Sequence, residues 1–162
     1  MRSRKPTTGS RSTASESTRA RPTPSPLDVA ARILTRAPRS EADLQDRLVA
    51  RGYQRATAER TVARCRELGY VGDERFARDR ARALRERGAG SLKIEADLTA
   101  RGLPEDLVEA AVEASREGES EAEWARRALA RAGRPAGASA WRLLASRGFP
   151  DDVVADVAGE RD

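Results

Sequence analysis

The side chains that could do chemistry in this chain are charged rather than nucleophilic. The 162 residues contain no histidine and a single cysteine, which excludes Ser-His and Cys-His nucleophile pairs, histidine metal sites and a cysteine-rich zinc cluster. No Gly-rich phosphate loop followed by Lys-Ser or Lys-Thr occurs. Glu119, Glu121 and Glu123 lie in an exposed-looking run with no apolar pocket to raise a carboxyl pKa. The sequence therefore predicts a protein that is not an enzyme and that needs no metal or cofactor.

The candidate contact surface is a row of four arginines. They follow one another at i, i+3, i+7 and i+10, so they would project from one side of a helix: Arg75, Arg78, Arg82 and Arg85. One interpretation is a stripe that contacts a partner. The other is a solvated face tied by i, i+4 pairs with Asp79 and Glu86, each contributing only about 0.2–0.5 kcal/mol. Four guanidiniums exceed what two acids neutralise, so both interpretations stay open.

The net charge of +5 is distributed unevenly along the chain. Residues 1–26 carry six basic and one acidic side chain, residues 27–88 fifteen and ten, and residues 89–162 ten and fifteen. The net charges of these segments are thus +5, +5 and −5. A basic first half can approach an acidic surface or a phosphate backbone, whereas an acidic second half suits a protein partner better than nucleic acid.

The composition predicts an all-α protein. Hydrophobic residues make up 38% of the chain and charged residues 35%, with six aromatics in all, so any core is thin and mostly aliphatic. Arg, Ala, Glu and Leu dominate, and no stretch alternates Val, Ile and Thr as a sheet would require. No run approaches the roughly 20 apolar residues that span a bilayer. We therefore expect a cytoplasmic protein with no membrane partner.

Residues 1–26 are predicted to be a disordered basic tail. They are rich in Ser, Thr, Pro and Arg and hold almost no large apolar side chains, so they cannot bury enough surface to offset the entropy of ordering. A solubilising leader is favoured over a nucleic-acid arm, because six dispersed cations form no dense block.

Local signals place the first helices. An apolar stripe at i, i+3, i+4 and i+7 indicates a helix over 27–35. Ser40 is a good N-cap for the next helix, and Gly52 is placed to end that helix in the left-handed conformation. Asp73 is expected to cap a long helix that runs to about Arg87.

An internal repeat sets the architecture. Three copies share the form apolar, three residues, apolar, two residues, Arg-Gly, apolar: Leu44, Leu48, Arg51, Gly52, Tyr53; Ile94, Leu98, Arg101, Gly102, Leu103; and Ala140, Leu144, Arg147, Gly148, Phe149. A second amphipathic helix follows each Arg-Gly, with Pro104 and Pro150 in its first turn, and a further helix precedes each pair. The repeat predicts three tandem three-helix units, 27–72, 73–118 and 119–158, stacked as a short curved solenoid.

For the remaining prominent side chains, a structural role is favoured over a role in binding. The repeat arginines Arg51, Arg101 and Arg147 should serve helix C-termini, where cations are favourable. The aromatics Tyr53, Tyr70, Phe76 and Phe149 could be base-stacking platforms, but a chain so poor in aromatics needs them in its core. Cys65, on the apolar face of its helix, is expected to be buried and inert.

The segment from Glu67 to Ala77, Glu-Leu-Gly-Tyr-Val-Gly-Asp-Glu-Arg-Phe-Ala, resembles the hallmark of the RecX family. In that family the first unit ends in Gly-Tyr, here with Tyr70, and the next helix opens with an Asp-Glu-Arg-Phe-Ala-like run, here with Asp73, Glu74 and Phe76. Together with the Arg-Gly copies the resemblance covers residues 27–158. RecX proteins tend to carry several basic residues before the last Arg-Gly-Phe, whereas residues 137–142 hold one.

The resemblance implies a monomeric protein whose partner is the RecA filament. Such a protein would bind the groove of the RecA–DNA filament, meeting nucleic acid as part of that complex, and damp ATP hydrolysis, strand exchange and LexA cleavage in DNA repair, recombination and the SOS response. The main alternative is a helix-turn-helix DNA-binding transcriptional regulator, because residues 40–70 alone resemble a winged helix-turn-helix. A third possibility is a pure scaffold of helical repeats.

Overall fold

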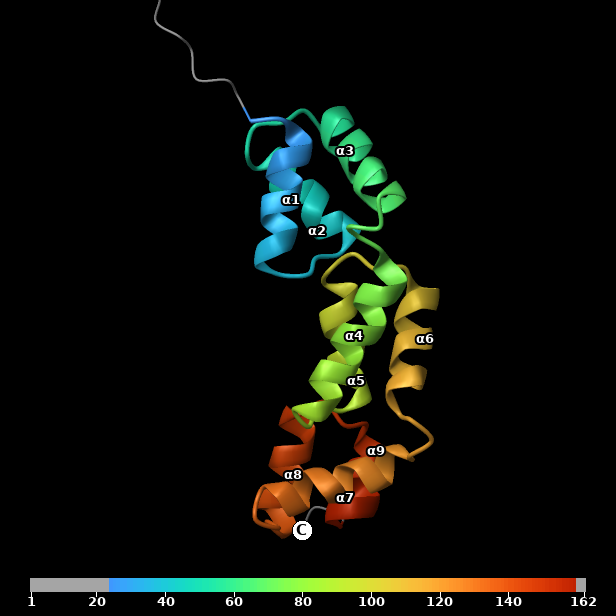
Figure 1. Ribbon diagram of the computed structural model, residues 1–162. Coiled ribbons are helices and arrows are strands. Elements are labelled where there is room, and N and C mark those ends of the chain that lie inside the picture. The colour runs from blue at the N-terminus through green and yellow to red at the C-terminus, as the bar shows by residue number, and fades with distance from the viewer. Residues whose placement is uncertain (1–23, 160–162) are drawn as a thin grey trace, which may run out of the picture.

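The computed structural model describes residues 24–159, and this part of the chain forms nine α-helices and no strands (Figure 1). The helices are α1 (Pro26–Arg36), α2 (Glu41–Val49), α3 (Arg55–Glu67), α4 (Asp73–Glu86), α5 (Ser91–Thr99), α6 (Glu105–Ser115), α7 (Glu121–Arg131), α8 (Gly137–Ser146) and α9 (Asp151–Ala158). The predicted all-α class is confirmed. Most of the predicted tail, residues 1–23, lies outside the described residues, and Pro26 at its end is already the first residue of α1, capped by Ser25.

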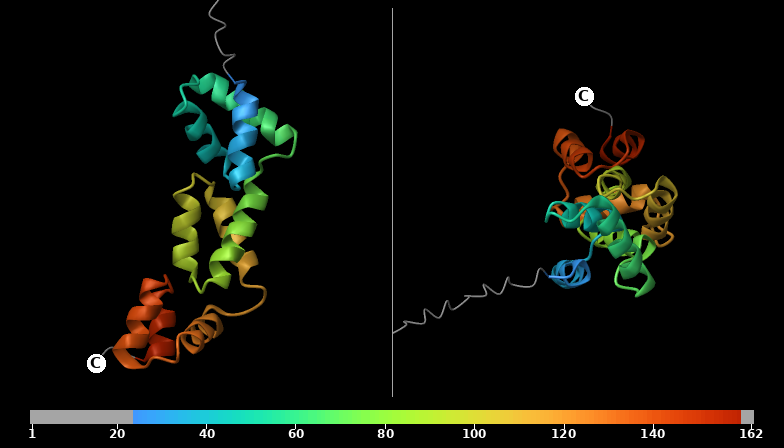
Figure 2. Two further views of the ribbon diagram at one scale, coloured as in Figure 1. Left: turned by 60° about the vertical axis from the view of Figure 1, so that its left-hand side comes forward. Right: turned by 90° about the horizontal axis from the view of Figure 1, so that it is seen from above.

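The helices are grouped in three units of three, stacked end to end, and the third unit is turned out of line with the first two (Figure 2). Helices pack chiefly against partners of their own unit. Each unit also has its own apolar cluster, centred on Leu44 and Leu48, on Ile94 and Leu98, and on Leu144 with Phe149. The short curved solenoid of three-helix repeats is thus confirmed, with three separate cores rather than one continuous core.

The same turn ends the middle helix of every unit. The repeat glycines have φ values of +92°, +73° and +76°, at Gly52, Gly102 and Gly148 respectively, a region that side chains with a Cβ avoid. In each turn the N–H of the next apolar residue donates to the carbonyl five positions earlier, as from Tyr53 to Leu48 at 3.3 Å. This is the Schellman arrangement, and it explains why Arg-Gly is followed by an apolar residue three times.

Helix starts agree with the sequence at Ser40 and differ by one residue elsewhere. The Ser40 hydroxyl accepts from the N–H of Asp43 at 3.2 Å, as an N-cap does. Pro104 and Pro150, however, are themselves the N-caps of α6 and α9, one residue before the predicted first turn. Asp73 is also shifted: Gly72 is the N-cap, and Asp73 is the first residue of α4.

A winged helix-turn-helix would need two strands after Val71, but the chain there enters α4. Among the described helices α4 is the longest, with 14 residues. None of these helices combines the length and the apolarity needed to cross a membrane.

Candidate partner-binding surface

Helix α4 has one apolar face and one arginine face. Phe76, Ala77, Ala81 and Leu84 are buried in the core of the second unit, which fixes the rotation of the helix. The three arginines on the other side are exposed, and we call them the arginine row: Arg75, Arg78 and Arg82. Arginine thus reaches the surface here because the apolar positions of the same helix are already packed.

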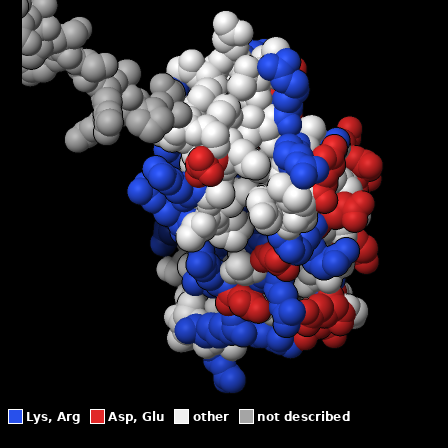
Figure 3. Space-filling model, turned by 45° about the horizontal axis from the view of Figure 1, so that its top comes forward, with Lys and Arg blue, Asp and Glu red and all other residues white. Residues whose placement is uncertain are grey.

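The row has few partners of its own. Arg82 lies 3.3 Å from Glu86 and 3.8 Å from Glu117, all three with exposed side chains, and such pairs contribute little to stability. Figure 3 shows that acidic side chains are densest on the right of the molecule, the side on which α6 lies in Figure 1, while basic side chains extend over the centre and left of that face with a few acids among them. The two kinds of charge are therefore unevenly distributed over this face.

Arg85, the fourth predicted member of the row, does not lie on the surface. The residue is 3% exposed, and its Nη2 lies 2.8 Å from Oε2 of Glu121, an ion pair in which neither atom makes a hydrogen bond among the described residues. The guanidinium also sits 5.4 Å from the ring centre of Trp124. Helix α7 covers the last turn of α4, so Arg85 joins the second unit to the third instead of facing a partner.

A groove of about 630 Å³ runs along the boundary of the first two units. Its apolar lining includes Leu34, Pro38, Val71 and Phe76, and Tyr70 lies at its side with 52% of its surface exposed. Its charged lining comprises four cations and one acid: Arg39, Arg75, Arg80, Arg101 and Asp79. Because Arg75 belongs to both, the arginine row and the groove form one continuous surface.

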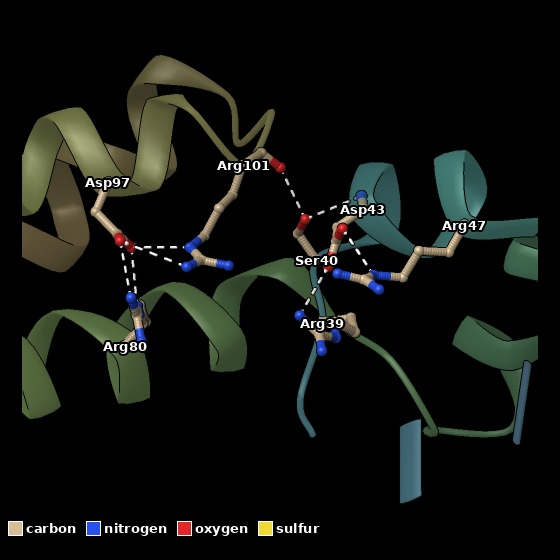
Figure 4. Close-up of polar contacts among 7 residues, drawn as sticks. All are labelled: Arg39, Ser40, Asp43, Arg47, Arg80, Asp97 and Arg101. Carbon is tan, nitrogen blue, oxygen red and sulfur yellow. Dashed lines mark hydrogen bonds and ion pairs between the residues drawn. The ribbon is translucent and has the colours of Figure 1, made fainter. Parts of the chain in front are cut away.

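The cationic wall is held in place by two aspartates (Figure 4). Asp97 of α5 accepts from Nε and Nη2 of Arg80, both at 2.8 Å, and from Nε of Arg101, also at 2.8 Å. The hydrogen bonds from Arg80, with help from Arg101, hold the pKa of the Asp97 carboxyl well below its usual range, against the effect of burial. Asp43 of α2 lies 3.3 Å from Arg39 and 3.0 Å from Arg47.

The opening acid of each following unit caps the middle helix of the unit before it. Asp73 Oδ1 accepts from the N–H of Glu41 at 2.8 Å, and Glu121 Oε1 accepts from the N–H of Ser91 at 2.7 Å. An acid at a helix N-terminus satisfies a free N–H and meets the positive end of the helix dipole. Asp73 thus caps α2, and the prediction that it caps α4 is wrong. Burial, and next the charge of Asp73, raise the pKa of the Glu41 carboxyl, although Arg66 opposes them.

Besides the capping acids, the Arg-Gly turns also join each unit to the unit before it. The Ser40 hydroxyl donates to the carbonyl of Arg101 at 2.7 Å (Figure 4). At the equivalent place one unit later, the N–H of Gly90 donates to the carbonyl of Arg147 at 2.8 Å, and the N–H of Leu92 to that of Gly148 at 3.0 Å. The middle helices of the first two units, α2 and α5, therefore begin on the turn that ends the middle helix of the next unit.

The other singled-out side chains divide between core and surface. Phe76 and Phe149 are buried, and Tyr53 is half-buried with its hydroxyl donating to the carbonyl of Pro24 at 2.8 Å. Tyr70 instead stays exposed, because the adjacent Val71 fills the core position. Cys65 is fully buried, and burial raises the pKa of its thiol, so the described structure gives it no reactive role.

The repeat arginine side chains have different partners. Nη1 of Arg51 donates to the carbonyl of Arg47 at 2.9 Å, at the C-terminus of α2. Arg101 pairs with Asp97 and lies 5.9 Å from the ring centre of Phe76. Over residues 24–159 no three Cys, Asp or Glu side chains come together in a way that could hold a metal ion.

Sequence reasoning missed both capping acids and the Asp97 network. The signal for the acids was present, since Asp73 and Glu121 open helices 48 residues apart, close to the repeat spacing. For Asp97 the sequence offers one local signal, the i, i+4 pairing with Arg101. Arg80 comes from another helix and cannot be paired with Asp97 by spacing alone.

Comparison with known proteins shows which family the chain is similar to. Two family models match it, the first three-helix domain of RecX over residues 27–65 and the second over residues 73–112. A protein of Chromohalobacter salexigens named Regulatory protein RecX is 35% identical over 138 residues, 80% of this chain and 88% of that protein. A protein of the same name from Legionella pneumophila is 34% identical over 83 residues, and this match spans 51% of the chain and only 55% of that relative.

A solved structure agrees at the level of the fold. The crystal structure of RecX from Lactobacillus salivarius superposes with a TM-score of 0.62 at 15% sequence identity, covering 82% of this chain and 91% of that chain. The superposition reaches beyond the two matched domains, and the Chromohalobacter salexigens relative is similar over four-fifths of the sequence. On this evidence the chain belongs to the RecX family.

Proposed function

We propose that this chain is a non-enzymatic, cytoplasmic regulator that binds the RecA filament and lowers the recombinase, ATPase and coprotease activities of RecA. The observation that carries the proposal is the 35% identity over 138 residues to a protein named Regulatory protein RecX. The resemblance of the Gly-Tyr and Asp-Glu-Arg-Phe-Ala segment to that family adds the partner, RecA. Negative regulation is the direction that this resemblance implies.

The geometry of α4 supports a partner surface on the first two units. The arginine row stands on a helix whose opposite face is buried, so its three guanidiniums are presented on a fixed frame and lose little freedom on binding. The units stack into an elongated body (Figure 1). Such a body can contact two neighbouring protomers of a filament at once, which raises avidity through effective concentration.

The test is a titration of the full chain against the ATPase of RecA on single-stranded DNA. Inhibition at substoichiometric protein is expected, since one bound copy in a filament affects more than one protomer. Absence of any effect at stoichiometric excess would overturn the proposal.

A matched pair of variants then tests the surface. Changing the whole arginine row, Arg75, Arg78 and Arg82, to Ala should keep helical circular dichroism yet weaken inhibition about tenfold or more, as expected when several charge contacts are lost. The control removes the same charge from exposed positions of α3, with Arg55, Arg60 and Arg64 changed to Ala. If the two triple variants inhibit RecA equally, the row is solvated surface and the partner binds elsewhere.

A further inference from the structure

The groove between the first and second units has a composition that fits one class of ligand. We propose that it binds an acidic protein segment that carries one large apolar or aromatic side chain among its carboxylates. This inference deepens the proposed function, and it rests on that function for the identity of the protein that supplies the segment.

The floor of the groove supplies the apolar half of the argument. Leu34, Pro38, Val71 and Phe76 line a hollow of about 630 Å³, a size that encloses a large side chain. Tyr70 borders it and is 52% exposed, in a chain with only six aromatic residues. Exposed tyrosine beside a concave apolar surface is typical of binding hot spots, since its ring gives contact area at little entropic cost.

The wall of the groove supplies the charge. The lining holds the guanidiniums of Arg39, Arg75, Arg80 and Arg101 and one carboxylate, that of Asp79. Behind it, Asp97 pairs with Arg80 and Arg101, and Asp43 pairs with Arg39 and with Arg47, which lies outside the groove. These five arginines and three aspartates together carry a net charge of +2. The Nε of Arg39 is buried and has no hydrogen-bond acceptor among the described residues. A carboxylate entering the groove would meet this excess.

The charge also argues against the other occupants. The tail, residues 1–26, has a net charge of +5 and would be repelled by the same guanidiniums. A nucleic-acid strand needs a track of cations that follows its phosphates, whereas the arginines here surround a concave apolar floor. Only an acidic segment with an apolar anchor satisfies both parts of the lining.

The experiment measures binding of a defined probe to the full chain by fluorescence anisotropy. The probe is a fluorescein-labelled peptide of four glutamates around one phenylalanine, and the comparison peptides replace the phenylalanine by alanine or the glutamates by glutamine. The wild-type chain should bind the probe at least about fivefold more tightly than either comparison peptide, because each removes one half of the recognition. Equal binding of all three peptides would overturn the inference.

Variants locate the site. Tyr70→Ala and Arg75→Glu should each weaken probe binding by about fivefold or more, with helical circular dichroism unchanged. Leu92→Ala, which truncates another exposed apolar side chain (48% exposed), is the control for Tyr70→Ala. Arg60→Glu on α3 is the control for the charge reversal. Loss of binding in the controls to the same extent, or displacement of the probe by an oligo-dT strand, would assign the binding to another surface or ligand.

The RecA assay separates the two proposals. If the probe binds as described but the wild-type chain leaves RecA ATPase unchanged, the groove inference stands and the proposed function fails. If the wild-type and Tyr70→Ala chains inhibit RecA equally and the probe does not bind, the proposed function stands and the groove inference fails. If both hold, excess probe should relieve the inhibition of RecA.

Discussion

Two junctions join the three units, and both use the same kind of backbone contact and capping acid. They differ in how far their ion pairs are exposed to water. In both, the start of a middle helix sits on the next Arg-Gly turn and is capped by the acid that opens the next unit. At the first junction the ion pairs around Asp43 and Asp97 are partly exposed beside an open groove. At the second, Arg85 and Glu121 are buried, with exposures of 3% and 8%.

The same kind of contact between units can therefore either leave a hollow open or close the junction. Where the ion pairs keep contact with water, the junction retains an open hollow with an apolar floor and charged side chains around it. Where they are buried under Trp124, the junction is packed shut, and any unpaired charge there becomes costly. The first junction is thus suited to binding and the second to rigidity.

The largest effect should come from removing the capping acid at the buried junction. Glu121→Ala leaves the Arg85 guanidinium buried without its carboxylate and should lower the free energy of unfolding by about 3–5 kcal/mol. The equivalent Asp73→Ala, at the half-exposed junction, removes one hydrogen bond to a backbone N–H and should cost about 1 kcal/mol. Urea denaturation of both variants measures the contrast, and equal losses would show that the two junctions do not differ.

The repeat glycines should form a graded series. An added Cβ at Gly148 would lie 2.6 Å from the backbone nitrogen of Lys93, one at Gly102 would lie 2.8 Å from Cβ of Ala42, and one at Gly52 would meet nothing within 4 Å. Since all three have positive φ, each Ala variant carries about 1 kcal/mol of backbone strain. The clash should raise the loss to about 2 kcal/mol at Gly102 and about 3 kcal/mol at Gly148. Thermal unfolding of the three variants in any other order would contradict the comparison.

The first junction should be the more sensitive to acid through Asp97. Its folded-state pKa lies below the ordinary value of 3.8, so its contribution to stability is present above that value and is lost as the pH falls through the folded pKa. Denaturation at pH 7 and near pH 2 should show a loss of about 1–2 kcal/mol in wild type that Asp97→Asn lacks. Asp106→Asn on the exposed start of α6 is the control, and an unchanged pH profile in Asp97→Asn would remove this assignment.

The smallest effect should fall on the exposed part of α4. Arg82→Ala breaks only pairs between exposed side chains, so the free energy of unfolding should change by less than about 0.5 kcal/mol. If the proposed function holds, the variant should bind RecA more weakly than the wild type at low salt and should lose less of its affinity as salt is raised, because one contact that salt screens is gone. A loss of stability above about 1 kcal/mol would mean that Arg82 has a structural role as Arg85 does.

Locally encoded features could be predicted from the sequence. The Arg-Gly-apolar turn is specified by a few consecutive residues, because only glycine takes the left-handed conformation cheaply and the next apolar side chain closes the turn. The Ser40 cap and the three-helix grouping follow from the same kind of short-range signal. These features fixed the fold class and the repeat.

Features that depend on distant segments could not be predicted. Arg85 has the helical spacing of an exposed residue, but its burial is decided by Trp124 and Glu121, which belong to the next unit. Tyr70 follows a glycine turn as Tyr53 does, yet Val71 takes the core position and leaves the ring outside. The groove itself exists only where two units meet, so no single stretch of sequence describes it.

The middle unit carries both halves of the inter-unit contact. Its Arg101-Gly102 turn receives the helix before it, and its own Gly90-Ser91 start rests on the turn after it. An array of this kind can lengthen by duplicating that whole module in frame, because the copied ends already match one another. Growth by duplication would not copy the boundary hollow, because Leu34, Pro38 and Arg39 of its lining belong to the first unit. A longer chain of this kind would therefore gain length and keep a single such recess.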